Sequence, residues 1–381
     1  MRGRYVKLIT LMLAVLLFAT GCWDSMDIED KNIATTVIFD KKDGEYRFSI
    51  EIASISSNLK NNVDAANSSN SYEASGFMFV DSKGATIPET RANMDQQMDK
   101  PLYLSAVRAL VITERAAETD LAEYLFRLQS IAEYRQKVNL FVTSEEPEDL
   151  EHSKTENASS FGFAVDDMLQ HLVDNGQAFS RMMSRYVDNI LSHSGFCIPC
   201  IDLQGNSMVL SGYCVIDYQA RCVGFISIGQ AKGLLLMKAD KPKADYVVPL
   251  GENQATVEVE LAQKETKPAY RDGKISFDMQ YGFDARVQYF KTANPMPMDE
   301  NMRAEITQKL GQMLKNELMG TIQQSQKEFM VDYLQFDDEF RVAFPEEFKN
   351  MDWAKEYPNA GMELNVEVNL EAAPRLDYNP S

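Results

Sequence analysis

In residues 107–143 the chain reads VRALVITERAAETDLAEYLFRLQSIAEYRQKVNLFVT, and this stretch decides the fold. Val107–Thr113 is an apolar, β-branched run typical of a buried strand, and Val138–Thr143 is a second run of this kind. Between them, Thr119–Tyr134 carries apolar residues at helical spacing, with a capping residue at its start. The order strand, helix, strand predicts a βαβ unit and hence an α/β layer.

The residues before this unit extend the same domain. Ile33–Asp40 and Tyr46–Ser54 flank an Asp-Gly turn, which predicts a β-hairpin. Ser57–Ser71 is dominated by Asn and Ser and predicts a loop. A short strand is expected at Phe77–Val80 and a helix at Ile87–Met98. Together these elements predict an N-terminal α/β domain over residues 22–145.

The second half of the chain has a different pattern. Residues 146–205 predict a middle, mainly helical segment or second domain, with helices at Phe161–Val173 and Ala178–Ile190. Residues 206–381 predict a C-terminal domain built of strands, a long helix over 299–329 and a final strand at Met362–Leu370. The other strand-like segments are Ser207–Ile216, Arg221–Ile228, Gly233–Met237, Tyr246–Val248, Thr256–Gln263, Lys274–Tyr281 and Phe283–Phe290.

These segments define the expected fold class. It is α+β with three domains, in which N-terminal α/β layers precede a C-terminal antiparallel sheet packed on a long helix. The mature chain is long enough for two or three domains, because domains typically run about 100–200 residues. No internal repeat is evident.

The first 22 residues have the layout of a bacterial lipoprotein signal. Basic residues come first, an apolar run extends from Leu8 to Ala19, and small residues precede Cys22. The run is shorter than the about 20 apolar residues that span a bilayer. We therefore predict a signal peptide over residues 1–21, cleavage after Gly21 and lipidation of the Cys22 thiol. The alternatives are an ordinary secreted protein and an uncleaved anchor.

The charge of the chain excludes some classes of partner. The formal net charge is -19, and removal of the three basic signal residues leaves a still more acidic body. Nucleic acid is excluded, because its binding depends on basic contacts to phosphate. Anionic lipid headgroups should repel this surface, so the lipid anchor, and not a basic patch, must hold the protein on a membrane.

Four cysteines follow the predicted lipidation site: Cys197, Cys200, Cys214 and Cys222. An exported location permits disulfides among them. A redox pair at Cys197 and Cys200 is a sharper alternative, but Pro199 sits in what reads as a loop-like approach to a strand. A zinc site is also less favoured, because Cys214 and Cys222 are eight residues apart. Structural disulfides and packed free thiols both stay open.

The sequence lacks the usual signs of an enzyme. His152, His171 and His193 are scattered, with no second ligand at metal spacing. No nucleophile elbow, phosphate-cradling glycine loop or H-E-x-x-H motif is present. We predict no catalytic residues, no metal and no cofactor.

Taken together, the motifs resemble those of the C-subunit lipoproteins of bacterial spore germinant receptors, the Ger(x)C family. The resemblance covers nearly the whole chain. It is carried by Gly21–Asp24, by Leu110–Glu114 with the following helix and Glu133–Arg135, by Leu210–Ile216, Val223–Phe225 and Gly233–Leu235, and by Asp332, Leu334, Phe336, Phe344, Pro345, Trp353 and Tyr357.

The resemblance implies a role. Proteins of this family are accessory, three-domain lipoproteins of a nutrient-sensing complex, and their partners are a membrane-embedded A subunit and a transporter-like B subunit. It implies a location on the outer face of the spore inner membrane and no catalytic residues. No small-molecule ligand is predicted. The alternative is an extracytoplasmic solute-binding lipoprotein that feeds a transporter, which would have two similar α/β lobes around a cleft.

Four residues in the C-terminal region have two interpretations each. Trp353 suits packing in the core, with a partner contact as the alternative. Asp332 and the pair Asp337 and Asp338 suit capping or solvated positions, with ion pairs across an interface as the alternative.

Overall fold

The computed structural model describes residues 30–53, 76–130, 134, 137–153, 160–291 and 298–371. The predicted signal peptide, Cys22 and the Asn/Ser-rich segment Ser57–Ser71 lie outside the described residues. Within the described part of the chain, no helix combines the length and the apolar composition needed to cross a membrane.

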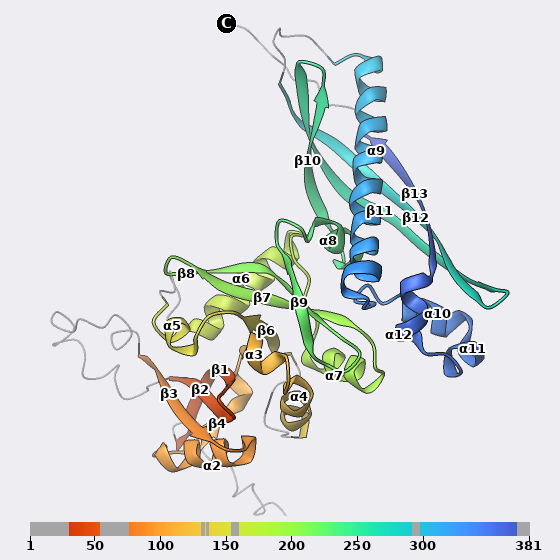
Figure 1. The fold of residues 1–381 in the computed structure, drawn as a ribbon. Helices are drawn as coiled ribbons and strands as arrows, with labels where there is room; N and C mark the ends of the chain where they lie inside the picture. The colour runs from red at the N-terminus through yellow and green to blue at the C-terminus, as the bar shows by residue number, and fades with distance from the viewer. Residues whose placement is uncertain are drawn as a thin grey trace, which may run out of the picture.

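A nine-stranded sheet forms the first body of the molecule, with strand order β3-β2-β1-β5-β6-β7-β8-β9 and the short β4 beside β1 (Figure 1). The strands are β1 (Asn32–Lys42), β2 (Glu45–Ala53), β3 (Phe77–Gly84), β4 (Leu102–Tyr103), β5 (Ala109–Thr113), β6 (Asn139–Thr143), β7 (Phe196–Gln204), β8 (Ser207–Ile216) and β9 (Cys222–Ser227). The central strands β1, β5, β6 and β7 run parallel, and the outer strands are antiparallel.

The two local motifs read from the N-terminal half are confirmed. β5 and β6 pair in parallel, with Leu110 opposite Leu140, and α4 (Leu121–Ser130) connects them. β1 and β2 form the predicted hairpin, in which Asp43 and Gly44 have positive φ angles of 54° and 81°. This is the backbone that a two-residue hairpin turn requires, and Asp-Gly adopts it readily.

Helices cover both faces of this sheet. One core lies between the strands and helices α2 (Ile87–Gln97), α4 and α7 (Met183–Leu191). A second core, on the opposite face, includes α5 (Pro147–Glu151) and α6 (Phe161–Asp174). Strand β5 needs cover on both faces, because its side chains are all buried and point alternately into the two cores. Strands buried on both faces are typical of the parallel part of an α/β layer.

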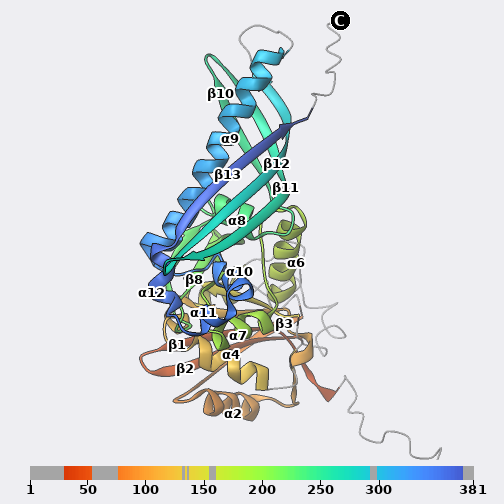
Figure 2. The same ribbon diagram turned by 90° about the vertical axis from the view of Figure 1, so that its right-hand side faces the viewer.

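A four-stranded sheet with a long helix forms the second body (Figures 1 and 2). Its strands are β10 (Lys243–Leu250), β11 (Asn253–Arg271), β12 (Lys274–Lys291) and β13 (Gly361–Leu370), in that order. Helix α9 (Glu300–Gln323) lies along one face and continues into the π-helical turn η5 (Gln324–Phe329), which matches the helix predicted over 299–329. Buried residues recur every four positions along α9: Ile306, Leu310, Leu314, Leu318 and Ile322.

Short helices close the end of this body that faces the first sheet (Figure 2). They are α10 (Phe336–Ala343), α11 (Pro345–Lys349) and α12 (Trp353–Glu356). The fold class is confirmed as mixed α and β, with two sheets and a long C-terminal helix. One detail differs, because β13 pairs with β12 in parallel, so the C-terminal sheet is not wholly antiparallel.

The strand predicted at Gly233–Met237 is wrong, since these residues belong to helix α8 (Lys232–Lys238). A short apolar run fits a buried helix as well as a strand, and only packing separates the two. The packing here depends on Gly233, where an added Cβ would lie 2.1 Å from Thr321 Oγ1 on α9. The glycine lets α8 lie directly against the long helix.

The expected antiparallel series from residue 207 to residue 290 is divided between the two sheets. β8 pairs with β7 and β9 pairs with β8 in the first sheet, and only β10 to β12 belong to the second. The predicted boundary between residues 205 and 206 falls in the β7–β8 hairpin turn, where Gly205 has a φ of 67°. Cys197 and Cys200 lie in strand β7 and not in a loop. Local pattern reveals a strand but not which sheet it joins.

Candidate functional site

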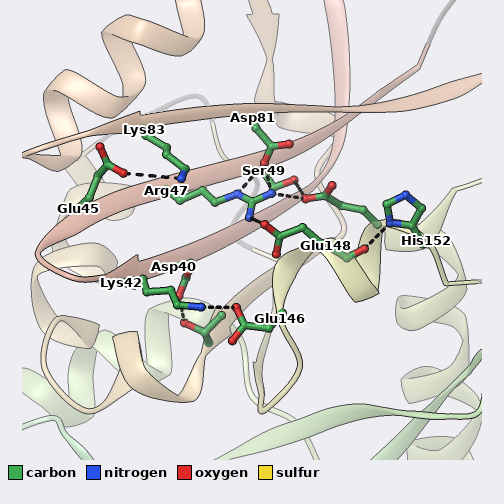
Figure 3. A network of polar contacts seen from close by, with 12 residues as sticks. Asp40, Lys42, Glu45, Arg47, Ser49, Asp81, Lys83, Glu146, Glu148 and His152 are labelled. Carbon is green, nitrogen blue, oxygen red and sulfur yellow. Dashed lines mark hydrogen bonds and ion pairs between the residues drawn. The ribbon is translucent and has the colours of Figure 1, made fainter.

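The first polar cluster lies at the carboxyl ends of β1, β5 and β6 (Figure 3). Arg115 reaches two carboxylates, with Nε 2.7 Å from Asp40 Oδ1 and Nη1 2.6 Å from Glu146 Oε1. Thr113 donates a 2.6 Å hydrogen bond to Asp40. These contacts hold the pKa of Glu146 at about 2 and raise the pKa of Arg115.

Arg47 forms a second clamp beside the first (Figure 3). Its guanidinium donates to Asp81 on β3 at 2.8 Å, to Glu151 on α5 at 2.9 Å and to Glu148. Ser49 also donates to Glu151 at 2.7 Å. Ligands of α/β sheets usually bind at the carboxyl ends of the parallel strands. In this protein, ion pairs between its own side chains occupy the carboxyl-end edge of the sheet and attach α5 to it. This edge therefore has a structural role.

Glu51 is a buried carboxylate that the sequence analysis missed. It is fully buried in β2 and accepts hydrogen bonds from the hydroxyls of Thr35, Thr36 and Ser160 and from the N–H groups of the first two residues of α6. A helix N-terminus favours a negative charge. Glu51 thereby fastens α6 to β1 and β2. The sequence signal that could have indicated this buried carboxylate was an acidic residue between two isoleucines in an otherwise apolar strand.

The second polar cluster, which we call the junction cluster, joins the two bodies and consists of Arg181, Lys238, Asp332, Gln335 and Asp337. Asp332 is fully buried and accepts hydrogen bonds from Phe336 N at 3.1 Å, Asp337 N at 2.8 Å and Trp353 Nε1 at 3.0 Å. The first two donors start helix α10. Asp332 thus bonds the first N–H groups of α10, as a capping side chain does, although Gln335 stands at the N-cap position; the solvated alternative does not hold, because Asp332 is buried.

Gln335 links the cationic members of the junction cluster. Its Oε1 accepts from Arg181 at 2.6 Å and from Lys238 at 2.7 Å, and Lys238 also donates to Leu334 O at 3.0 Å. Gln335 has a positive φ of 65°, as does Met330 at 53°. Left-handed backbone at non-glycine residues persists where the surrounding structure holds it. The connection from α9 to α10 is therefore held in one conformation by contacts with the first body.

Burial sets the protonation of this cluster. Burial, together with repulsion from Arg181 and Lys264, lowers the pKa of Lys238 to about 7. Burial also raises the pKa of Asp332 to about 8, with a further contribution from the neighbouring Asp337 carboxyl. Asp337 accepts from Ser194 through Oδ2, while its Oδ1 has no partner among the described residues. The arrangement connects two bodies and presents no nucleophile to solvent.

Trp353 lies within the core of the second body. Its side chain is 7% exposed, and its ring packs against the rings of Phe277, Phe340, Phe348 and Tyr357. This placement matches the packing interpretation and leaves little surface for a partner. Asp338, in contrast, is exposed and pairs with Arg341 on the same helix.

The four late cysteines are not equivalent. Cys214 and Cys222 form a disulfide between the adjacent strands β8 and β9, with Cα atoms 6.2 Å apart. Cys197 and Cys200 are buried free thiols, and burial raises the pKa of both. A redox-active cysteine needs a lowered pKa and access to solvent. The residues that the structure describes contain no group of three or more His, Cys, Asp or Glu side chains that could hold a metal ion.

Comparison with known proteins gives matches over nearly the whole chain. The family described as "Spore germination protein N-terminal domain" matches residues 24–203, and the family described as "Spore germination B3/ GerAC like, C-terminal" matches residues 211–373. The gap between these ranges falls at the β7–β8 hairpin.

One curated relative and one solved structure are similar along most of their length. Spore germination protein KC of Bacillus subtilis (strain 168) is 20% identical over 410 aligned residues, which cover 97% of this chain and 95% of that protein. The crystal structure of the GerBC protein has a TM-score of 0.57 at 12% identity and covers 88% of this chain and 97% of that one. At this identity the structural likeness concerns the fold.

Proposed function

The chain belongs to the Ger(x)C family of spore germination receptor C subunits, and from this we propose that it is the lipid-anchored accessory subunit of a nutrient germinant receptor. In this role it is required for nutrient-triggered spore germination. It acts by assembly or signal coupling with a membrane-embedded A subunit and a transporter-like B subunit. It resides on the outer face of the spore inner membrane.

The observation that carries the proposal is the match of both family descriptions over residues 24–203 and 211–373. This family is one of receptor subunits and not a known enzyme family. The two polar clusters support a role in assembly, because they hold helices and sheets in fixed positions and expose no reactive group. The solute-binding alternative receives less support, since the second body is a sheet with one long helix and not a second α/β lobe.

The proposed anchor is the Cys22 thiol. Each buried methylene of an acyl chain contributes about 0.8 kcal/mol to membrane binding, and stable anchoring takes two chains. We expect Cys22→Ala to abolish lipidation and to release the protein from the membrane fraction, while the matched variant Ser25→Ala stays bound. Membrane retention of Cys22→Ala equal to that of Ser25→Ala, with germination unchanged, would contradict the anchoring part of the proposal.

The receptor role is tested in spores. We expect deletion of the gene to abolish the response to particular nutrients in a panel of amino acids and sugars, while a receptor-independent germinant still acts. Because related receptors can mask a loss, the same panel is run in a strain that lacks the paralogous genes. A full nutrient response in that background would refute the receptor role and would make calorimetry of the purified protein with solutes the next experiment.

A further inference from the structure

An open groove of about 600 Å³ runs along the second body, lined by residues of α9, η5 and β10 and by Gln230, just before α8. Its lining includes Tyr246, Met313, Glu317, Gly320, Gln324 and Glu328. Three of these residues lie on α9 and two on η5, at successive spacings of four, three, four and four positions, so they follow one side of the continuous helix. The family comparison assigns no role to this surface.

Gly320 is the first sign that something approaches this stripe. It lies three residues before the last residue of α9, where the chain continues as the helical turn η5, and glycine is one of the least favourable residues in a helix. Packing within the chain does not account for it, because a Cβ at Gly320 would have no described atom within 4 Å. Gly233 shows the contrast, since its missing Cβ makes room for Thr321. The space over Gly320 is therefore free for another molecule.

Tyr246 is a second, independent sign. Its side chain is only 4% exposed, and its hydroxyl has no hydrogen-bond partner among the described residues. A buried polar group without a partner is unfavourable, and such groups usually bond to something. Because Tyr246 lines the groove while its hydroxyl oxygen is buried, a small movement of the groove wall would bring this hydroxyl within reach of a bound donor or acceptor.

The charges of the groove indicate what kind of molecule fits. Glu317 and Glu328 both line it, and neither forms an ion pair within the described residues. They are eleven positions apart, which corresponds to about 16 Å along a helix. Anionic lipid is excluded by this charge, and a second copy would bring acidic surface against acidic surface. A stripe at helical spacing with glycine near its centre suits close approach of another helix.

We propose that this groove is the docking site for a basic helix of a partner protein, which lies along α9 and makes its closest approach at Gly320. Lysine or arginine side chains about three turns apart on the partner face Glu317 and Glu328, and a polar group of the partner reaches the Tyr246 hydroxyl. The inference rests on the proposed function only in naming the partner, which would be the A or the B subunit.

The test uses the full chain with bulky substitutions that fill the groove. Gly320→Trp places a large side chain in the open space, and Gln308→Trp is the control, because Gln308 is exposed on α9 and lies about 120° round the helix from Gly320. We expect both variants to keep the Tm of the wild type within a few degrees. We expect Gly320→Trp alone to reduce the A or B subunit that co-purifies from spore membranes by at least tenfold.

A photo-crosslinking amino acid identifies what fills the groove. Placed at Asn316, which lines the groove, it should give an adduct whose crosslinked peptide carries lysine or arginine and is helical; placed at Gln308, it should give at least tenfold less. If the wild type co-purifies with its partners and Gly320→Trp does so equally well, the groove proposal is overturned and the receptor role stands. If the wild type fails to co-purify, the receptor role fails. In that case equal adducts at Asn316 and Gln308, or none at either site, overturn the groove as well.

Discussion

Replacement of Trp353 by Phe tests the assignment of Asp332 as the buried group that ties Trp353 to the start of α10. The variant keeps an aromatic ring but removes the Nε1–H that donates to Asp332 at 3.0 Å. Asp332 is protonated in the folded protein below about pH 8, and a hydrogen bond between neutral groups contributes about 0.5–1.5 kcal/mol. The smaller ring leaves a void among its aromatic neighbours that adds about 1 kcal/mol. We therefore expect the free energy of unfolding at neutral pH to fall by about 2 kcal/mol.

The measurement is urea unfolding followed by far-ultraviolet circular dichroism, because the substitution removes one of only two tryptophans. Phe348→Leu is the matched control. Phe348 packs on Trp353 with ring centroids 5.6 Å apart, yet its ring offers no hydrogen bond to Asp332, so its loss should cost about 1 kcal/mol. A loss for Trp353→Phe no larger than for Phe348→Leu would refute the reasoning.

The pH dependence gives a second check of the same reasoning. The pKa of Asp332 is raised to about 8 in the folded protein from 3.8, so the folded state holds a proton that the unfolded state loses. The stability from this group is fully present below about pH 4 and declines as the pH rises through about 8. The tryptophan N–H favours the carboxylate, so in Trp353→Phe the decline should extend to higher pH.

Three other predictions concern the first body. Glu51→Gln should lower the free energy of unfolding by about 2–4 kcal/mol, because the amide N–H groups would face the hydroxyl and backbone N–H donors that now bond to the carboxylate. The control Glu45→Gln, at an exposed position, should change it by less than about 0.5 kcal/mol. Equal urea midpoints for the two variants would contradict this prediction. The arginine partner of Glu146 lowers its pKa from 4.5 to about 2 in the folded protein, so its contribution to stability should be lost as the pH falls from about 4.5 to about 2. In Glu146→Gln, the Tm measured by thermal unfolding should therefore depend less on pH in that window. Reduction of the Cys214–Cys222 disulfide should lower the free energy of unfolding by about 2–3 kcal/mol. Thiol titration of the denatured, unreduced chain from residue 23 onward should find two free thiols, and a count of four would refute the pairing.

The elements that could be predicted from sequence are those whose signal is local. The βαβ unit at residues 107–143, the hairpin at Asp43 and Gly44 and the long helix near 299–329 each depend on the spacing of apolar residues and on turn chemistry over fewer than forty positions. The strand predicted at Gly233–Met237 was wrong because a run of five apolar residues fits a strand and a buried helix equally well. Its contact with α9 decided between the two.

The polar clusters could be predicted only in part, because their members meet across long stretches of chain. Asp332 was expected to have a capping or a solvated role, and only the structure decided between them, because it shows the side chain buried with its N–H donors a few positions away. Glu51 bonds to Ser160, 109 positions away, and Arg181 bonds to Gln335, 154 positions away. A pattern of neighbouring residues in the sequence cannot predict hydrogen bonds between positions this far apart.

The sequence alone determined the fold class, the family and the expected lipid attachment at Cys22, because these depend on residue types at short, fixed spacings. Only the tertiary structure decided that β8 and β9 complete the first sheet, that Cys214 pairs with Cys222 and that Tyr246 and Gly320 face an open groove. The physical reason is the same in each case. Strand partners, buried hydrogen bonds and empty space are set by segments that become neighbours only when the chain has folded.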